Sequence, residues 1–503
     1  MIKKINSVVA ALIFFVMAKA QEPVFTENFE QAAGIETVTG ISGKALNLGP
    51  DAGVRQVMIT KHSLTGKENG FAVTIWVRAE QQSYEAYDIL SSLEKKGDFF
   101  DGWKIGVTAQ GAWEFKVLKD SKLRYVYTTT APRQTIRNGD WHLLAVTYDG
   151  KELRFYYNGN LMAIYRADGI EAFFAPQELV IGGAPDSEYF YKKLGWKTYW
   201  DSFNGQIDDI AIYGNAINAD KISAYYTRVT GKKPAPASVD YMPDVFMLTA
   251  FNIFHGAHEF GKETGKAHLI KMLRDMNSDA YLLVETYGSG AEIADALGYH
   301  LYLISTNLSI ISRYPFTKTH NLTSPFNAGA AQVQVSNGKK INLVCLWLNY
   351  LPARNIGNGE GWSKEKYLEE ENKTRGADMR QILSDIKPEL EQKDSIPLIV
   401  AGDFNSGSHL DWTEHTKSIH KGYTMPWPVS IAMKNAGFKD SFREIHTDPL
   451  TTPGTTFYKT DRIDYIYYTG KSIYAIDAEI IGEHPVVFPS DHSVMSTLFR
   501  LGK

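Results

Sequence analysis

The stretch IPLIVAGDFN, from Ile396 to Asn405, joins a short apolar run to a glycine, a carboxylate and an amide. An apolar run of this length between polar segments predicts a buried strand. Asp403 and Asn405 stand two residues apart where that strand leaves the core, which would put both side chains on one face. Gly-Asp-x-Asn is equally typical of a turn, because these residues are common in turns. The rest of the chain must decide between a turn and a site for a hard cation and a phosphate oxygen.

The chain has 503 residues, too many for one hydrophobic core, and this length predicts two or more domains. The formal net charge of −4 argues weakly against a general DNA-coating role, although a local basic patch can be hidden in the sum. The single cysteine, Cys345, stands inside an apolar run and is predicted to be a small buried core residue. One cysteine excludes an intrachain disulfide.

The N-terminus has the pattern of a signal peptide. Lys3 and Lys4 precede a short apolar segment at 8–17, and Ala18-Lys19-Ala20 is a small-x-small cleavage signal. The apolar segment is too short to span a bilayer comfortably, and no later segment has a transmembrane pattern. We therefore expect residues 1–20 to be a signal peptide, and the mature chain, from Gln21, to be exported to a periplasm or released.

Residues 21–230 contain many short β-rich runs. FAVTIWV (71–77) is one, and WHLLAVTY (141–148) meets LRFYY (153–157) across the turn sequence DGKE. Short strands separated by Gly, Asn and Asp predict an all-β sandwich.

Several sequence phrases in this half occur in the order that is found in proteins of a known fold. The phrases are FAVTIWVRA, DWHLLAVTYDGKELRFYYNGNLMA, IGG at 181–183 and FNGQIDDIAIYGNAINADKISAYY at 203–226. Together they are similar to a laminin-G/concanavalin-A-like jelly roll. The resemblance implies binding or spacing more often than catalysis, with a glycan as a candidate ligand.

Two features of this half have alternative interpretations. Asp208 and Asp209 are candidate Ca²⁺ ligands, as acidic residues are in some relatives, but capping of backbone groups at a strand start is favoured. A second feature is the aromatic set Tyr189, Tyr191, Trp196 and Trp200, which suits either a sugar-stacking platform or packing on the next domain.

A linker is predicted between the two halves. The sequence GKKPAPAS at 231–238 has the Pro/Ala/Ser composition of a semi-rigid spacer. We place the boundary at 231–241 and the second domain at 242–503.

Residues 242–503 alternate strand and helix patterns. Strands are predicted at 245–251, 280–284, 308–311, 341–348, 396–403, 461–468 and 494–499, and helices around 269–276 and 379–386. Several strands end at, or carry, a polar group that suits a metal or a phosphate: Asn252, Glu285, Asp403 with Asn405, Asp464, and Asp491 with His492. Strand ends at one rim of a sheet converge, so these groups predict one site.

The predicted site has the chemistry that phosphoester cleavage needs. A hard divalent cation prefers carboxylate oxygens and offsets phosphate charge. Glu285 is the expected principal metal ligand, with Asn252 and Asp491 as further ligands.

The remaining groups suit proton transfer and charge stabilisation. His492, oriented by Asp464, is a candidate general base or electrostatic stabiliser. Asp403 is expected to orient the attacking water, and Asn405 to donate to a phosphoryl oxygen.

Six phrases of this half follow the order of a known superfamily. They are FNIFHG (251–256), LLVETYG (282–288), LSIISRYPF (308–316), VAGDFNS (400–406), DRIDYIYY (461–468) and SDHSVM (490–495). The half resembles the endonuclease/exonuclease/phosphatase superfamily, which has a DNase I-like fold. The resemblance implies a four-layer α/β sandwich and phosphoester hydrolysis that depends on Mg²⁺ or Mn²⁺.

One position departs from the superfamily pattern. Many members carry a second histidine on the strand before the long helix, and Trp347 stands there in this chain. Candidates for the missing phosphate contact are Asn349 and Tyr350, or His255, His258 and His409 from nearby loops.

Two function classes therefore compete. The first is an exported metal-dependent phosphoesterase whose substrate is a nucleic acid, a phospholipid head group such as sphingomyelin or a phosphoinositide, or a soluble phosphoester. The second is an exported carbohydrate-binding or adhesion protein with a degenerate phosphoesterase domain, and Trp347 is its only support.

Overall fold

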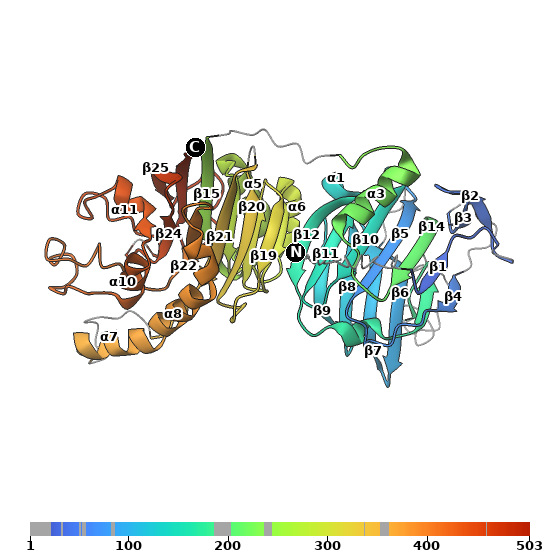
Figure 1. Ribbon diagram of the computed structural model, residues 1–503, viewed down its shortest axis with the longest axis horizontal. Helices are drawn as coiled ribbons and strands as arrows, with labels where there is room; N and C mark the ends of the chain where they lie inside the picture. The colour runs from blue at the N-terminus through green and yellow to red at the C-terminus, as the bar shows by residue number, and fades with distance from the viewer. Residues whose placement is uncertain are drawn as a thin grey trace, which may run out of the picture.

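The computed structural model describes residues 22–31, 34–49, 52, 57–81, 86–185, 203–235, 244–335, 338–352, 362–458 and 460–502. The predicted signal peptide and the aromatic stretch 189–200 lie outside these residues. The described chain forms two lobes side by side, the first coloured blue to green and the second yellow-green to red (Figure 1). Among the described residues, no helix has the length and apolarity needed to cross a membrane.

The N-terminal domain is a sandwich of two antiparallel sheets. Its elements are β1 (Phe25–Glu27), β2 (Thr37–Thr39), β3 (Lys44–Asn47), β4 (Met58–Lys61), β5 (Phe71–Ala79), β6 (Tyr87–Lys96), β7 (Phe99–Val107), β8 (Trp113–Lys119), β9 (Lys122–Thr128), α1 (Ala131–Gln134), β10 (His142–Tyr148), β11 (Glu152–Tyr157), β12 (Asn160–Arg166), η1 (Glu171–Phe174), β13 (Glu178–Ile181), β14 (Gly205–Tyr213) and α3 (Ala219–Thr230). One sheet has the order β2-β3-β14-β5-β10-β11-β12, with β1 also paired to β14, and the other has the order β4-β13-β6-β7-β8-β9. The predicted jelly-roll fold is confirmed.

Helix α3 is the element that the all-β prediction omitted. Asn218 caps its first turn by accepting a hydrogen bond from the Lys221 amide, and Gly231 ends it in the left-handed conformation. The helix covers the outer face of the sheet, where Tyr226 stacks on Trp76 with ring centroids 5.8 Å apart. The apolar residues of α3 therefore complete a small second core on that face.

A buried histidine makes the jelly roll sensitive to acid. The His62 Nδ1 atom accepts a hydrogen bond from the Leu64 amide, and Nε2 lies 3.1 Å from Ser92 Oγ. Burial lowers the pKa of His62 from 6.5 to about 4. Since the folded state resists protonation that the unfolded chain accepts, the free energy of unfolding must fall as the pH drops from about 6.5 towards 4.

We therefore expect His62→Gln to flatten the pH dependence of unfolding. The shift in pKa corresponds to about 3 kcal/mol between these two pH values, because one pKa unit is worth about 1.4 kcal/mol. Urea melts at pH 7.5 and pH 4.5 would measure it. If the variant loses as much stability on acidification as the wild type does, His62 is not the cause of the pH dependence.

The C-terminal domain consists of two packed sheets with helices on both outer faces. Its elements are β15 (Val245–Asn252), α4 (Phe254–Ala257), α5 (Lys262–Met276), β16 (Ala280–Val284), α6 (Gly290–Leu297), β17 (His300–Leu303), β18 (Leu308–Ser312), β19 (Phe316–His320), β20 (Ala328–Gln334), β21 (Lys340–Trp347), α7 (Lys364–Lys373), α8 (Arg375–Asp385), α9 (Lys387–Glu391), β22 (Leu398–Asp403), α10 (Pro428–Asn435), β23 (Lys439–Asp440), α11 (Ser441–Ile445), β24 (Asp464–Thr469), β25 (Ile473–Ile481) and β26 (Val494–Leu501). One sheet runs β17-β18-β16-β15-β26-β25 and the other β19-β20-β21-β22-β24-β23.

Three apolar clusters hold these layers together. The sheets meet through buried residues such as Leu282 and Ile399. Leu269 of α5 packs on the outer face of the first sheet, and Met379 of α8 on that of the second. This order of helix, sheet, sheet and helix is the predicted four-layer sandwich, and Cys345 is buried within it as expected.

The strand prediction at 461–468 is wrong at its start, since β24 begins only at Asp464. Arg462 precedes the strand and is buried, with its guanidinium 2.8 Å from carboxylate oxygens of both Asp411 and Asp440. Two buried ion pairs therefore fix the chain before the strand, and Arg462 does not share a strand face with Asp464.

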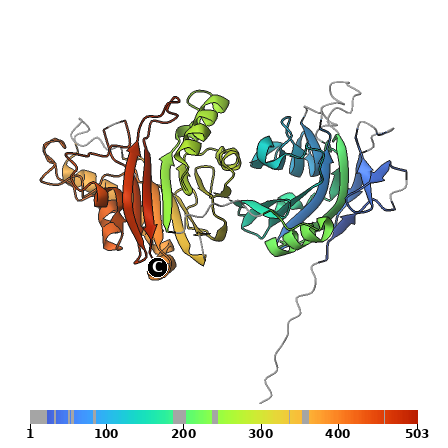
Figure 2. The ribbon, with the colours of Figure 1, turned by 90° about the horizontal axis from the view of Figure 1, so that it is seen from above.

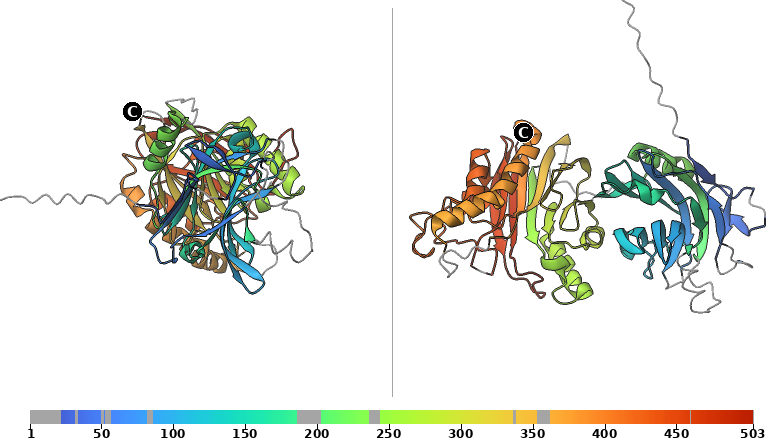
Figure 3. Two further views of the ribbon diagram at one scale, coloured as in Figure 1. Left: turned by 90° about the vertical axis from the view of Figure 1, so that its right-hand side faces the viewer. Right: turned by 90° about the horizontal axis from the view of Figure 1, so that it is seen from below.

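The two domains share one sheet. Strand β12 of the jelly roll pairs in parallel with β17, with Ala163 opposite Leu301 and Tyr165 opposite Leu303. This pairing joins the domains into a sheet of fourteen strands. The view from above (Figure 2) and the right-hand view of Figure 3 show the same two lobes side by side. The domains thus contact each other directly, beyond the covalent link that the sequence predicted.

A buried carboxylate reinforces this contact. Asp295, on α6 of the second domain, accepts hydrogen bonds from the backbone and hydroxyl of Thr130 at 2.6 and 2.5 Å, and from Gln134 Nε2 at 2.7 Å. Asp295 is 4% exposed. Three donors of the jelly roll therefore depend on one side chain of its neighbour.

We expect Asp295→Ala to lower the free energy of unfolding by about 3 kcal/mol, because it leaves buried donors unsatisfied. The control is Asp275→Ala, which removes an exposed partner of Lys271 and His484 and should cost much less stability than Asp295→Ala. Urea melts of both variants would measure the difference. Equal losses would show that Asp295 does not hold the domains together.

Candidate active site

Four strand ends bring polar side chains together at one rim of the second domain. Asn252 ends β15, and Glu285 directly follows the parallel strand β16. Asp403 ends β22, and its register partner on the antiparallel strand β24 is Asp464. Because the first pair comes from one sheet and the second pair from the other, the site spans both sheets, whereas the sequence predicted these strand ends at one rim of a single sheet.

Asn252 links the two sheets. Its Nδ2 donates to Glu285 Oε1 at 3.1 Å and to Asp403 Oδ2 at 3.2 Å, and lies 3.4 Å from His492 Nε2. Its Oδ1 accepts a hydrogen bond from the Phe254 amide. The side chain is 1% exposed, so this amide sits at the centre of the cluster.

His492 and Asp464 form the predicted pair. His492 Nδ1 lies 2.8 Å from Asp464 Oδ2, and His492 Nε2 lies 4.0 Å from Asp403 Oδ2. Burial alone would lower the pKa of His492, but the charge and hydrogen bond of Asp464, with a further contribution from Asp403, raise it to about 9. The imidazole is therefore protonated at neutral pH and donates from Nδ1 to Asp464.

Asp403 is fully buried, and Asn405 holds it. Burial raises the pKa of Asp403 to about 7, and the charge of Asp464 adds to the effect. The Asn405 amide donates to Asp403 Oδ1 at 2.8 Å, and Asn405 Nδ2 to Asp403 Oδ2 at 3.1 Å and to the Leu348 carbonyl at 3.0 Å. Asn405 has a φ of +50° and lies beyond the strand, so the predicted shared strand face is wrong.

The acidic groups of the site fit a divalent cation. Asp491 Oδ1 is buried and has no hydrogen-bond partner among the described residues. Burial raises the pKa of Asp491, and the charges of Glu285 and Asp464 raise it further. Carboxylates that repel each other, one with an unsatisfied oxygen, are the donors that Mg²⁺ or Mn²⁺ accepts.

A second grouping of possible ligands overlaps this one. Ligand atoms of Asp403, Asp464 and His492 lie within 4.8 Å of one another. The hydrogen bond between Asp464 and His492 occupies one atom of each, so this trio is better suited to proton transfer than to holding an ion.

The remaining predicted residues differ in their distance from the cluster. His255 is exposed, and its Nε2 lies 3.9 Å from Glu285 Oε2. His258 Nε2 is buried without a hydrogen-bond partner among the described residues. His409 instead faces α10, where its Nδ1 lies 2.9 Å from Ser430 Oγ. No hydrogen bond or ion pair joins His409 to the cluster in the described part of the chain.

Trp347 supplies an aromatic surface where the superfamily pattern has a histidine. Its register partner on β22 is Asp403. The indole contacts Phe326 and Tyr350, with centroids 5.6 and 6.2 Å away. Tyr350 is 58% exposed, and the neighbouring Asn349 accepts the Leu351 amide. The substitution thus places aromatic rings beside the site.

Two positioning residues were missed by sequence reasoning. Asn307 Oδ1 accepts the Glu285 amide at 3.1 Å. Ser490 Oγ donates to the Asn252 carbonyl at 2.7 Å and accepts the His492 amide at 3.0 Å. Ser490 belongs to the SDH phrase and was open to prediction, whereas Asn307 has no distinguishing sequence signal.

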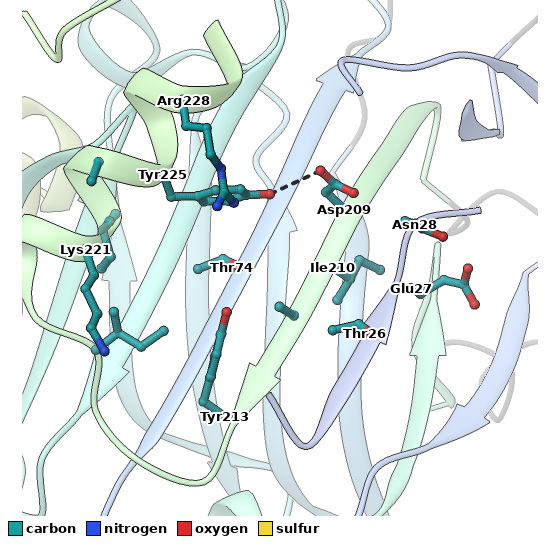
Figure 4. A pocket seen from close by; sticks show the side chains of 14 residues that line it. Thr26, Glu27, Asn28, Thr74, Asp209, Ile210, Tyr213, Lys221, Tyr225 and Arg228 are labelled. Carbon is teal, nitrogen blue, oxygen red and sulfur yellow. Dashed lines mark hydrogen bonds between the residues drawn. The ribbon is translucent and has the colours of Figure 1, made fainter. Parts of the chain in front are cut away.

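The jelly roll has a pocket of its own, of about 640 Å³, between α3, β1 and β14. Figure 4 shows Tyr225 and Asp209 facing each other across it, with a hydrogen bond of 3.3 Å. Asp208 instead accepts the backbone amides of Ser42 and Asp209 at 3.1 and 2.8 Å. This geometry favours the predicted capping role of Asp208 over a calcium site.

Comparison with protein families assigns both halves. Residues 51–223 match the model of the concanavalin A-like lectin/glucanases superfamily, and residues 249–492 match that of the endonuclease/exonuclease/phosphatase family. This chain joins a concanavalin A-like domain to an endonuclease/exonuclease/phosphatase domain. Such a second domain is of the phosphoesterase type, and the superfamily generally uses divalent metals.

Individual relatives are distant. The chain is 28% identical over 248 residues to "Uncharacterized protein F14F9.5" of Caenorhabditis elegans, covering 44% of this chain and 78% of that protein. The human Nocturnin catalytic domain with bound sulfate anion is 16% identical, with a TM-score of 0.37, over 52% of this chain and 96% of that chain. An endonuclease/exonuclease/phosphatase from Beutenbergia cavernae is 15% identical, with a TM-score of 0.35, over 52% and 72%.

Proposed function

We propose that this protein is an exported, divalent-metal-dependent phosphoesterase that hydrolyses a phosphodiester or phosphomonoester. The observation that carries the proposal is the convergence of Asn252, Glu285, Asp403, Asp464 and His492 through the contacts of Asn252 and the pair of Asp464 with His492. Export rests on the N-terminal sequence pattern alone. The jelly roll is proposed to bind a glycan.

The cation would be held by Glu285 and Asp491, with Asn252 beside them. When bound, Mg²⁺ or Mn²⁺ would offset charge on the phosphoryl oxygens. Asn252 has to turn its Oδ1 from the Phe254 amide to serve as a ligand, because its Nδ2 now faces the carboxylates.

The protein's own residues supply the remaining chemistry. Asp403 is placed to orient the water and take its proton, because its raised pKa makes it a stronger base than an exposed carboxylate. Protonated His492 donates from Nε2 to a phosphoryl oxygen and stabilises the charge that develops there. Asn405 holds Asp403 in place, and can contact phosphate only by releasing one of its present acceptors.

A screen of the purified mature protein tests this proposal. The substrates are bis-p-nitrophenyl phosphate, p-nitrophenyl phosphate, plasmid DNA, RNA, sphingomyelin and phosphoinositides, each with Mg²⁺, Mn²⁺ or EDTA. We expect turnover of at least one substrate, and its loss in EDTA. Turnover that is equal in EDTA would refute the metal dependence.

The alternative is a carbohydrate-binding protein with a degenerate second domain. Trp347 remains its only support, since the cluster retains its carboxylates and its histidine in mutual contact. Absence of turnover on every substrate, together with glycan binding by the full chain, would favour this alternative.

A further inference from the structure

The shared sheet brings part of the jelly roll to the rim of the candidate active site. Strand β12 is parallel to β17, and β16 and β15 run in that same direction, because β17 and β16 each pair antiparallel with β18. The end of β12 at Arg166 therefore lies at the same sheet edge as Glu285 and Asn252. Three strand spacings separate β12 from β16, which is about 14 Å.

A cleft of about 730 Å³ lies between the domains at this edge. Arg124 and Tyr125 of β9 line its jelly-roll wall. The opposite wall includes Lys262 at the start of α5 and Tyr287 in the loop after Glu285. The cleft is thus built by both domains, and its lining residue Tyr287 stands two residues after the predicted metal ligand Glu285.

More cationic than anionic side chains line the cleft. Arg166 is paired with Asp168 at 2.9 Å, and the buried ammonium of Lys266 is paired with Glu292. Arg124 and Lys262 also line the cleft, on opposite walls, and neither has a carboxylate partner among the described residues. Each side chain is exposed, so both charges face solvent.

Two further observations agree with a positive cleft. Burial lowers the pKa of His258, a lining residue, and the charges of Lys262 and Lys266 lower it further. Helices α5 and α6 both begin at the cleft, and neither has a side-chain cap on its first amides. Those amides add to the attraction for an anion.

An exposed aromatic ring lies between these cations and the candidate site. Tyr287 is 47% exposed, and its ring meets His255 edge-on with centroids 5.6 Å apart. Cations along a cleft with a stacking ring are the features that hold single-stranded nucleic acid, whose bases stack and whose phosphates repeat along the chain.

We propose that the cleft between the domains binds a single strand of nucleic acid, with phosphates on Arg124 and Lys262 and a base on Tyr287, and leads it to Glu285. The proposal rests on the proposed phosphoesterase function and makes the jelly roll one wall of the substrate site. It adds a nucleic-acid substrate class to that function.

The test is binding of fluorescein-labelled octathymidylate to the full-length mature protein, by anisotropy in EDTA at 50 to 200 mM salt. For Arg124→Ala/Lys262→Ala we expect an affinity about tenfold weaker and a salt slope reduced by about 1.4, since each phosphate contact on a single strand contributes about 0.7. The matched control is Lys44→Ala/Lys61→Ala, which removes two exposed charges on β3 and β4, away from β12, and should change neither value.

Turnover of bis-p-nitrophenyl phosphate separates this inference from the proposed function. The wild type and the Lys44→Ala/Lys61→Ala control should hydrolyse that small diester equally, whether or not the cleft binds octathymidylate. No wild-type turnover would defeat the phosphoesterase proposal while leaving the binding result standing. The cleft assignment would be overturned if the wild type did not bind octathymidylate, or if both double variants lost the same affinity for it. Binding to anionic vesicles in place of octathymidylate would also overturn it.

Discussion

Replacing His492 with alanine is expected to lower turnover of bis-p-nitrophenyl phosphate by about 10²- to 10⁴-fold. The substitution removes the imidazolium that Asp464 holds at 2.8 Å and that lies 4.0 Å from Asp403. Two buried carboxylates, Asp464 and Asp403, keep this imidazole protonated. Without the imidazolium, no such donor stabilises the negative charge that develops on the phosphoryl oxygens. Steady-state rates at saturating Mg²⁺ measure the effect.

The matched control is a second histidine–aspartate pair on the surface. His415 Nε2 lies 3.1 Å from Asp448, and both side chains are exposed, so His415→Ala should leave turnover unchanged. Asp464→Asn should also reduce turnover, since it removes the charge that keeps His492 protonated. If His492→Ala destabilises the protein because it leaves Asp464 without its partner, His492→Asn can replace it, because asparagine retains a polar side chain. Full activity in a folded His492→Asn protein would reject the assigned role.

The sequence predicted the convergence of the site because its parts sit at strand ends. Asp403 and Glu285 each close an apolar run, and a run that ends in a carboxylate is visible without a structure. The pairing of Asp464 with His492 was proposed from the residue types and supported by the superfamily resemblance, since 28 residues separate them and no local pattern connects them.

Local geometry was less predictable. Asn405 and Asp403 have the spacing of one strand face, but the strand ends at Asp403 and the left-handed backbone of Asn405 turns its amide back. Arg462 fits the alternation of the following strand, yet two buried carboxylates hold it outside that strand. In both cases a contact with a polar group outweighs the two-residue period.

The relation between the domains was the largest omission. The Pro/Ala-rich sequence at 231–238 predicted a spacer, and such composition carries no information about contacts elsewhere. The contact depends on the pairing of β12 with β17 and on Asp295, which stands in an ordinary helix pattern. Backbone pairing between distant strands and one buried carboxylate leave no signature in a single sequence.

Replacing Glu285 with glutamine is expected to abolish the stabilisation of the protein by Mg²⁺ or Mn²⁺ and to lower turnover at least 10²-fold. A ligand that binds only the folded state stabilises it by about 2.7 kcal/mol at a concentration 100 times its Kd. Wild-type protein should therefore melt at a higher temperature in excess metal than in EDTA. The variant should show little difference, because it lacks the charge of the principal proposed ligand.

The same substitution has a distinct effect without metal. Glu285 contributes to the raised pKa of Asp491, so the charge of Glu285 is unfavourable to its neighbour when no cation is bound. Glu285→Gln should leave the melting temperature in EDTA equal to or above that of the wild type, whereas a merely structural role would lower it. Glu479→Gln, on the exposed face of β25, is the control and should behave as wild type in both conditions. A metal-induced shift that persists in Glu285→Gln would place the cation elsewhere, with the trio of Asp403, Asp464 and His492 as the next site to test.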